Sequence, residues 1–419
     1  MKTGGAKLSK RFLIWVAAVF ALGTRIPAAC EEDRYARADA VALAVKCEPG
    51  ASIASLARAL TSGLTSDEER ARTIFRWIAE NVSYSAGRAA SSGGAHAVLR
   101  SRTAACEGYA SLFAAICRAA GLEAEVIGGY SKGYHYRAGG ALSLKPDHAW
   151  NAVKIGGVWR LVDCTWGAGY LDDSGRFHRL FNGHYFLTPP EEFIFDHFPE
   201  DPKWQLLARP LSREEYQQLV MVRPPFFRYG LRPVSHRQAE VRLRGPGSVT
   251  IGAPPDVALM ARLYSGDTEV AGTPVFVRRS SNAEVQINPP AAGAYRLRIF
   301  AKSCDSSGPY EWAAEYSIKA EAAGEPDAYP RAYEAYYRRS VCLDGPVRGR
   351  LPAGQPVSFR IRVPEASQVA LVSGDEWTFL EEKENWREGT VVPKRGPLQL
   401  AAAFPGSDRF ELLLSYDVQ

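Results

Sequence analysis

Residues 147–166 read Asp147-His-Ala-Trp-Asn-Ala-Val-Lys-Ile-Gly-Gly-Val-Trp-Arg-Leu-Val-Asp-Cys-Thr-Trp166, and this stretch decides the fold. Two glycines, Gly156-Gly157, separate the strand-like segments His148–Ile155 and Val158–Asp163. A two-residue glycine turn between such segments predicts a β-hairpin, because a type I′ turn needs a positive φ at both central positions.

The register of this hairpin predicts a catalytic pair. We expect Ile155 to pair with Val158 across the turn. His148 then lies opposite Thr165, and Asp163 becomes its diagonal neighbour on the same face. The two side chains would be about 7 Å apart or less at Cβ, within reach of an imidazole–carboxylate hydrogen bond.

A cysteine precedes this hairpin at the expected start of a helix, which runs from Cys106 to Gly121. The backbone N–H groups and the dipole of a helix start favour a thiolate, and they offer donors for an oxyanion. The alternative is a buried structural thiol, as expected for Cys117. Thiol, base and carboxylate together are the parts of an acyl-transfer site.

Three motifs resemble the transglutaminase-like superfamily, in the order Cys, His, Asp. They are Ala105-Cys-Glu-Gly-Tyr-Ala-Ser-Leu-Phe113, Asp147-His-Ala-Trp-Asn-Ala-Val153 and Trp159-Arg-Leu-Val-Asp-Cys-Thr-Trp-Gly-Ala-Gly169. Three further blocks resemble the kyphoscoliosis peptidase family: Ile74–Tyr84, Tyr185–Phe193 and His197–Leu207.

The resemblance covers about residues 65–207. It implies an α+β, papain-like or transglutaminase-like core in which the helix of the nucleophile packs on an antiparallel sheet. It also implies catalytic roles for Cys106, His148 and Asp163, and β-rich modules after the core. Cys164 stands where such sequences usually have proline. On the expected register it faces away from His148, which favours a structural or disulfide role.

Two tryptophans and the other histidines are secondary candidates. Trp166 and Trp150 flank the triad and could line a substrate cleft, although the hydrophobic core is the alternative for Trp150. The remaining histidines show no metal-ligand spacing, so we expect surface or packing roles, no metal and no cofactor. They are His96, His135, His178, His184, His197 and His236.

The first residues predict a signal peptide. A basic start is followed by the short apolar run Phe12–Gly23 and by Ile26-Pro-Ala-Ala29, with cleavage expected after Ala28. A dozen apolar residues are too few to span a bilayer. Acylation of Cys30, as in a lipoprotein, is the less favoured alternative because Pro27 stands where an aliphatic residue is wanted. The sequence therefore predicts a secreted or otherwise exported protein, periplasmic or extracellular.

Charge and cysteine content agree with such a protein. The 419-residue chain has a net charge of +5 and a pI near 8.7. The signal segment holds five basic residues and no acidic one, so its removal lowers the charge to about 0. Nothing then favours nucleic acid. Seven cysteines leave at least one unpaired in an oxidising compartment; Cys304–Cys342 and Cys30–Cys47 are conceivable bridges.

The C-terminal half predicts two β-sandwich modules. Pro255–Asp267 resembles Pro364–Asp375, and the strands after Gly293 and Gly406 look equivalent, which indicates a repeat of about 90 residues, the size of an immunoglobulin-like domain. The predicted organisation is a signal peptide (1–28), a helical segment (29–64), a transglutaminase-like core (65–207), a linker (208–237) and two β-sandwich modules (238–325 and 326–419).

The sequence thus predicts a cysteine enzyme that acts on peptide or protein substrates, most simply a protease. Amine transfer, which cross-links proteins, is a second hypothesis. A non-catalytic peptide-binding or scaffold protein is the third, with the β modules contacting an extracellular or surface partner.

Overall fold

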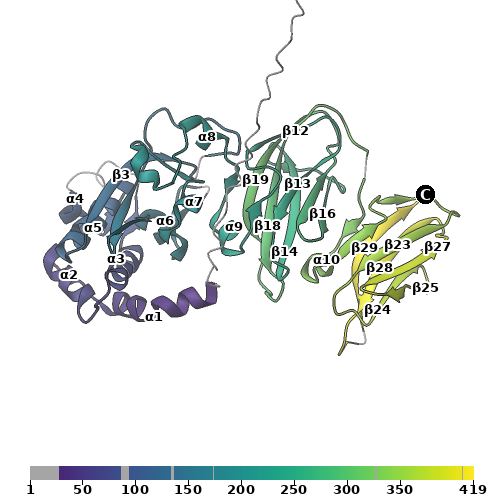
Figure 1. Cartoon of the computed structure of the whole chain (residues 1–419), viewed down its shortest axis with the longest axis horizontal. Coiled ribbons are helices and arrows are strands. Elements are labelled where there is room, and N and C mark those ends of the chain that lie inside the picture. Colours follow the sequence, from purple (N-terminus) through teal and green to yellow (C-terminus); the bar gives the residue numbers. More distant parts are fainter. Residues whose placement is uncertain (1–27, 86–93, 134–135, 173, 326–327, 408) are drawn as a thin grey trace, which may run out of the picture.

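The computed structural model describes residues 28–85, 94–133, 136–172, 174–325, 328–407 and 409–419. A mixed helix–sheet core domain, a first β-sandwich and a second β-sandwich follow one another from purple to yellow in Figure 1. This architecture confirms the predicted fold class.

The core domain is built on a five-stranded antiparallel sheet. Its strand order is β8-β5-β4-β3-β9. The strands are β3 (Ala124–Ser131), β4 (His148–Ile155), β5 (Val158–Val162), β8 (Phe186–Thr188) and β9 (His197–Pro199). Five helices precede β3 or lie around it: α1 (Ala28–Ala44), α2 (Ile53–Thr61), α3 (Asp67–Asn81), α4 (Gly94–Ser101) and α5 (Cys106–Ala119).

The helix α5 packs on β3 and β4 through a continuous apolar face. Its buried residues include Tyr109, Phe113 and Ile116, which recur at helical spacing. Asn151 of β4 fixes the helix to the sheet, because its side-chain nitrogen donates to the carbonyl oxygen of Ala110 at 2.9 Å. The start of α5 is therefore held over the strand that begins with His148.

The β4–β5 hairpin has the predicted register over its strands. Ile155 pairs with Val158, and both turn glycines have a positive φ, 56° at Gly156 and 84° at Gly157. The pairing ends at Asn151 and Val162, so the expected pair of His148 with Thr165 does not form. The chain turns instead into the short helix α6 (Cys164–Ala168).

Short elements complete the core domain. They are β1 (Ser83–Tyr84), β2 (Thr103–Ala104), β6 (Gly169–Leu171), β7 (Phe177–Arg179), α7 (Pro190–Phe193) and two 3₁₀ turns, Gly183–Tyr185 and Pro202–Gln205.

The two sandwiches repeat one topology. The sheets of the first have the orders β10-β19-β18-β14-β15 and β11-β13-β17-β16, and those of the second β20-β29-β28-β24-β25 and β21-β23-β27-β26. In both, a further strand pairs in parallel with the last one, β12 with β19 and β22 with β29. The predicted repeat therefore extends to every strand.

The strands of the first sandwich are β12 (Glu240–Leu243), β13 (Gly247–Gly252), β14 (Val257–Ser265), β15 (Thr268–Glu269), β16 (Val275–Arg279), β17 (Ala283–Ile287), β18 (Gly293–Ser303) and β19 (Glu311–Ala320). Those of the second are β20 (Arg331–Ala332), β21 (Cys342–Gly345), β22 (Arg350–Leu351), β23 (Val357–Arg362), β24 (Gln368–Ser373), β25 (Glu376–Phe379), β26 (Glu381–Lys383), β27 (Trp386–Val391), β28 (Gly396–Ala403) and β29 (Phe410–Val418), with α10 (Glu334–Arg338) after β20.

One part of the predicted repeat was misaligned. The strand β18 starts at Gly293, and its equivalent by sheet position is β28, which starts at Gly396. The predicted counterpart, the strand after Gly406, is β29 and corresponds to β19. One glycine begins β28 and another lies shortly before β29. Composition alone therefore favoured the wrong one of these two strands.

The predicted linker, residues 208–237, is folded. It forms α8 (Arg213–Gln218), β10 (Met221–Val222), α9 (Pro224–Arg228) and β11 (Arg232–Pro233). The strands β10 and β11 pair with β19 and β13, so this segment supplies an edge to both sheets of the first sandwich. Two-residue strands beside prolines carry no periodicity, which explains why the sequence did not reveal them.

The described cysteines are all free. Cys47, Cys304 and Cys342 are unpaired, so neither conceivable bridge forms; the side chain of Cys30 lies outside the described residues. Cys304 lies 3.5 Å from Ser340 Oγ instead.

The predicted signal peptide falls almost wholly on residues 1–27, which lie outside the described part of the chain. The first described element is α1. Across the described ranges, the helices are too short or too polar to traverse a bilayer.

A glycine in β3 provides a stability test. A Cβ on Gly129 would meet the Phe198 carbonyl oxygen, the Trp150 ring at 2.5 Å and Pro199 Cα at 2.9 Å. We expect Gly129→Ala to destabilise the core domain by about 3 kcal/mol, because overpacking against backbone cannot relax. Calorimetry would measure this loss. The matched control is Gly245→Ala, whose Cβ would meet nothing within 4 Å. Equal unfolding temperatures for the two variants would contradict this account of Gly129.

Candidate active site

Cys106 is the first residue of α5. The preceding residue, Ala105, offers no side-chain cap, and its carbonyl oxygen accepts hydrogen bonds from Gly108 and Tyr109 at 3.0 and 3.1 Å. The first N–H groups of the helix therefore remain beside the thiol, where the helix dipole favours negative charge. Cys106 is half-buried whereas Cys117 is fully buried. Of these two thiols, only Cys106 is open to a reagent.

His148 and Asp163 meet at the end of the hairpin. His148 Nε2 lies 2.8 Å from Asp163 Oδ2. Asp163 also caps α6, because its Oδ1 accepts hydrogen bonds from the backbone N–H groups of Thr165 at 2.7 Å and Trp166 at 3.1 Å. The cap turns the carboxylate back toward β4. The two residues are thus neighbours as predicted, although a helix cap rather than a continued strand brings them together.

The thiol and the imidazole form a coupled pair. Since Nε2 of His148 is bound to Asp163, Nδ1 is the ring nitrogen left for Cys106. Burial alone would raise the pKa of the Cys106 thiol, but the hydrogen bond with His148 and the charge of that ring lower it below its ordinary value. A backbone hydrogen bond from Ala149 lowers this pKa further.

Asp163 makes the imidazole strongly basic. Burial alone would lower the pKa of His148, but the charge of Asp163 and its hydrogen bond raise it to about 10. The pKa of Asp163 is held well below its usual value by the charge and hydrogen bond of His148, against the effect of burial. At neutral pH this geometry favours a Cys106 thiolate beside a protonated His148.

His197 is a site residue that the sequence interpretation missed. It was assigned a surface or packing role, but it is fully buried in β9, and its Nε2 lies 3.1 Å from Asp163 Oδ2. Its position after Asp196 and before Phe198, at the start of a block that itself resembles the family, is the signal that could have identified it.

The two tryptophans lie differently. The half-buried Trp166 stacks on His148 with 5.0 Å between ring centroids and an interplanar angle of 26°, so it can still wall a substrate cleft. Trp150 is only 1% exposed and belongs to the core cluster. The structure therefore supports the core alternative for Trp150 and corrects its assignment as a cleft residue.

The other histidines lie outside this cluster. His178 pairs with Asp172 at 2.6 Å, His184 stacks on Phe227, His96 is exposed, and His236 bonds Ser235. His135 lies outside the described residues.

Among the described residues, His148, Asp163 and His197 are the group whose ligand atoms lie close enough to hold a metal ion, within 4.8 Å of one another. In this structure these atoms are hydrogen-bonded to each other, and the chemistry below uses those hydrogen bonds.

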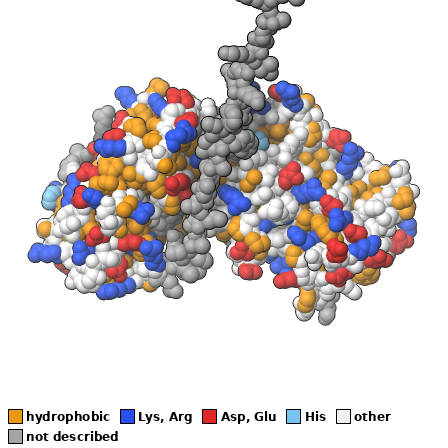
Figure 2. Space-filling model, viewed as in Figure 1, with side chains coloured by type: hydrophobic (Ala, Val, Ile, Leu, Met, Phe, Trp, Pro, Cys, Tyr) orange, Lys and Arg blue, Asp and Glu red, His pale blue; other side chains and the backbone are white. Residues whose placement is uncertain are grey.

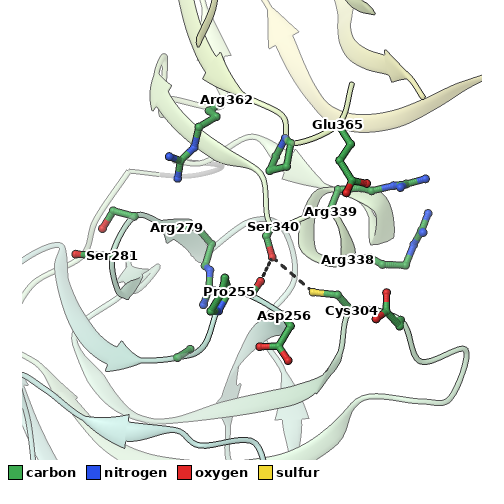
Figure 3. A pocket seen from close by; sticks show the side chains of 14 residues that line it. Pro255, Asp256, Arg279, Ser281, Cys304, Arg338, Arg339, Ser340, Arg362 and Glu365 are labelled. Carbon is green, nitrogen blue, oxygen red and sulfur yellow. Dashed lines mark hydrogen bonds between the residues drawn. The ribbon is translucent and has the colours of Figure 1, made fainter. Parts of the chain in front are cut away.

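A cavity of about 490 Å³ lies elsewhere, between the two sandwiches. Figure 3 shows arginines such as Arg279 and Arg362 around it together with the acidic Asp256 and Glu365. None of the triad residues lines this cavity. Its wall carries both signs of charge, so it does not define an anion or cation site.

Comparison with known proteins assigns the domains. The family model of the transglutaminase-like superfamily matches residues 54–164, and the model described as KY-like, immunoglobulin-like domain matches residues 213–330. A solved structure of a TGase is 18% identical, covering 40% of this chain and 40% of that one, with a TM-score of 0.21. The match to the family model defines the first folded unit as a transglutaminase-like domain.

The relatives are more specific. Kyphoscoliosis peptidase of Mus musculus is 36% identical over 261 residues, which cover 61% of this chain and 38% of that protein. Hillarin of Drosophila melanogaster is 33% identical over 297 residues, covering 63% and 36%. The chain therefore combines a transglutaminase-like domain with a KY-like immunoglobulin-like domain and is homologous to kyphoscoliosis peptidase, which confirms the resemblance. It spans less than half the length of these relatives.

Proposed function

We propose that this chain is a thiol acyl-transfer enzyme that acts on peptide or protein substrates, most simply a cysteine peptidase. One observation carries the proposal. A half-buried thiol at an uncapped helix start lies beside an imidazole whose second nitrogen is held at 2.8 Å by a buried carboxylate. Thiol, base and orienting group are the complete set that this chemistry needs.

The proposed reaction has two halves. Cys106 Sγ attacks the carbonyl carbon of a peptide bond, and the protonated His148 gives its proton to the leaving amine, so that a thioester forms. The N–H groups at the start of α5 stabilise the oxyanion. Water then attacks the thioester while His148 takes its proton, and the carboxylic acid leaves as Cys106 is restored.

Two alternatives share this site. If Cys106 instead attacks the side-chain amide of a glutamine, ammonia leaves as the thioester forms, and an amine that attacks this thioester gives a new amide, so that the enzyme cross-links proteins. If neither reaction occurs, the fold serves as a peptide-binding or scaffold domain. The lowered pKa of Cys106 favours chemistry over scaffolding, because a pure binder gains nothing from an activated thiol.

A single assay separates the three functions. Purified protein is incubated with a peptide library and a biotinylated amine, and mass spectrometry records cleavage and amine incorporation. Cleaved peptides support the peptidase, biotinylated glutamine supports amine transfer, and neither product in repeated assays would contradict the enzyme proposal.

Export and partners form part of the same proposal. The basic start and apolar run before Ala28 support secretion or another route of export, and the mature N-terminus tests it. On the visible face in Figure 2, basic and acidic side chains are intermingled, which suits protein contacts better than nucleic acid. The immunoglobulin-like modules supply surfaces for an extracellular or surface partner.

A further inference from the structure

A second histidine shares the carboxylate of the triad. His197 is buried between two carboxylates, with Nε2 3.1 Å from Asp163 Oδ2 and Nδ1 2.6 Å from Asp196 Oδ1. The same Oδ2 atom of Asp163 is 2.8 Å from Nε2 of His148. One oxygen atom therefore serves two imidazole rings.

The surroundings fix the ring of His197 in this place. Phe193 stacks on it with 3.9 Å between centroids and an interplanar angle of 20°, and Trp166 lies 4.4 Å away on centroids. The second carboxylate is fixed too. Tyr185 donates to Asp196 Oδ2 at 3.3 Å, and the backbone N–H of Lys132 donates to the Asp196 carbonyl oxygen at 2.9 Å. Within the described part of the chain, the hydrogen-bond partners of the two ring nitrogens are these two carboxylates.

This geometry sets the charge on His197. A neutral imidazole has one N–H donor, whereas both nitrogens donate in the imidazolium form. Both contacts of His197 are with carboxyl oxygens, so as long as Asp163 and Asp196 are ionised, both contacts are hydrogen bonds only if the ring is protonated. The buried chain then alternates in sign through His148, Asp163, His197 and Asp196, which is how buried charges are best compensated.

We propose that His197 is a positioning residue of the active site, a cation that holds Asp163 Oδ2 and offsets part of its negative charge at Cys106 and His148. This inference rests on the proposed acyl-transfer function. The proposed site then has four polar groups, Cys106, His148, Asp163 and His197, and His197 acts through Asp163. The two ring centroids of His148 and His197 are 5.3 Å apart, so the charge of one acts strongly on the other.

Other charged groups surround this chain and stay in place when His197 is changed. On the side of Asp196 these are Arg223 and Lys132. Arg223 faces Asp196 from directly before α9, and Lys132 directly follows β3 and has its pKa lowered to about 7 by burial in spite of Asp196. Tyr185 faces both Asp163 and Asp196.

The test is the pH dependence of Cys106 alkylation by iodoacetamide in the full chain, for wild type and His197→Gln. Glutamine keeps an N–H donor for Asp163 but removes the positive charge. Loss of that charge should raise the pKa values of both Cys106 and His148. Both inflections of the rate should therefore move to higher pH, by about one unit. Asp163→Asn should lower the pKa of His148, because the negative charge that raises this pKa is lost.

The matched control is His178→Gln. This variant removes a histidine outside the group His148, Asp163, His197 and Asp196. His178 Nε2 lies 2.6 Å from Asp172, and 40% of the His178 side chain is exposed. Its profile should equal that of wild type. If His197→Gln changes the rate at every pH without moving the inflections, His197 has a merely structural role and the proposal is overturned.

A measurement on the unmodified protein covers the case in which His197→Gln does not fold. In ¹⁵N-histidine NMR spectra at pH 7, both ring nitrogens of His197 should be protonated. An unprotonated nitrogen in this ring would overturn the proposal. Peptide turnover is not needed for either experiment. A shifted profile without turnover would therefore refute the acyl-transfer function while leaving the role of His197 supported.

Discussion

Cys106→Ala should abolish both peptide cleavage and amine incorporation and leave the protein folded. The loss should be complete within detection, because water and the remaining groups form no thioester. The side chain is half-buried at a helix start, so its truncation should change the free energy of unfolding by no more than about 1 kcal/mol. Turnover with the peptide library and thermal unfolding would measure these two quantities.

The control for this variant is Cys304→Ala. Cys304 has a similar partial exposure but lies in the first sandwich, beside Ser340. It should retain full turnover. In wild type, iodoacetamide should label Cys106 well below the ordinary pKa of a thiol, and before Cys304. Substantial activity in Cys106→Ala would show that the nucleophile is another residue.

Asp163→Asn should reduce turnover by about 10⁴-fold, as in other triads that lose their carboxylate. The oxygen of asparagine can still cap α6, which leaves the amide nitrogen facing Nε2 of His148 and Nε2 of His197. When the two Nε2 atoms carry protons, the N–H group of the amide faces two other N–H donors. His148 can accept from this amide only in the neutral tautomer with its proton on Nδ1, so it can no longer take a proton from Cys106 or act as the imidazolium partner.

Asp163→Asn should also lower the free energy of unfolding. A substitution in an open cleft would have only a small effect on this quantity. Asp163 is fully buried, and removing one member of a buried charge network costs about 3 kcal/mol. The pKa of Asp163 is lowered in the folded protein, so its ionisation stabilises the fold above the pKa of an unfolded aspartate. That contribution is lost as the pH falls, and the stability difference between wild type and variant should narrow in acid.

The loss occurs below the pKa of an unfolded aspartate, about 4, so urea unfolding at pH 7 and at about pH 2 would measure this difference. The alkylation profile would report the site. A profile of Asp163→Asn that coincides with wild type would remove Asp163 from the triad and leave a dyad of Cys106 and His148.

The hairpin shows what the sequence could predict. Two adjacent glycines determine the turn, the turn determines the register, and the register brings His148 and Asp163 to one end of the sheet. These are local relations, and they depend on the chain within about 20 residues. The position of Cys106 followed in the same way from the start of a periodic helix.

His197 shows what the sequence could not predict. Its strand, β9, has three residues and pairs with β3, more than 60 positions earlier in the chain. Nothing in three residues specifies such a partner, because long-range pairing depends on packing rather than on local preference. For the same reason, the sequence did not predict the edge strands β10 and β11.

Asp163 holds the cap of α6 as well as the imidazole, whereas the side chain of Cys106 bonds His148 and the backbone of Ala149 and caps no helix. Selection for folding alone would thus preserve the aspartate in a descendant that had stopped turning over substrate, while the cysteine would be free to drift. In a set of related chains, we therefore expect the loss of cysteine at position 106 to mark proteins without the proposed activity, whereas aspartate at position 163 is expected in active and inactive proteins alike.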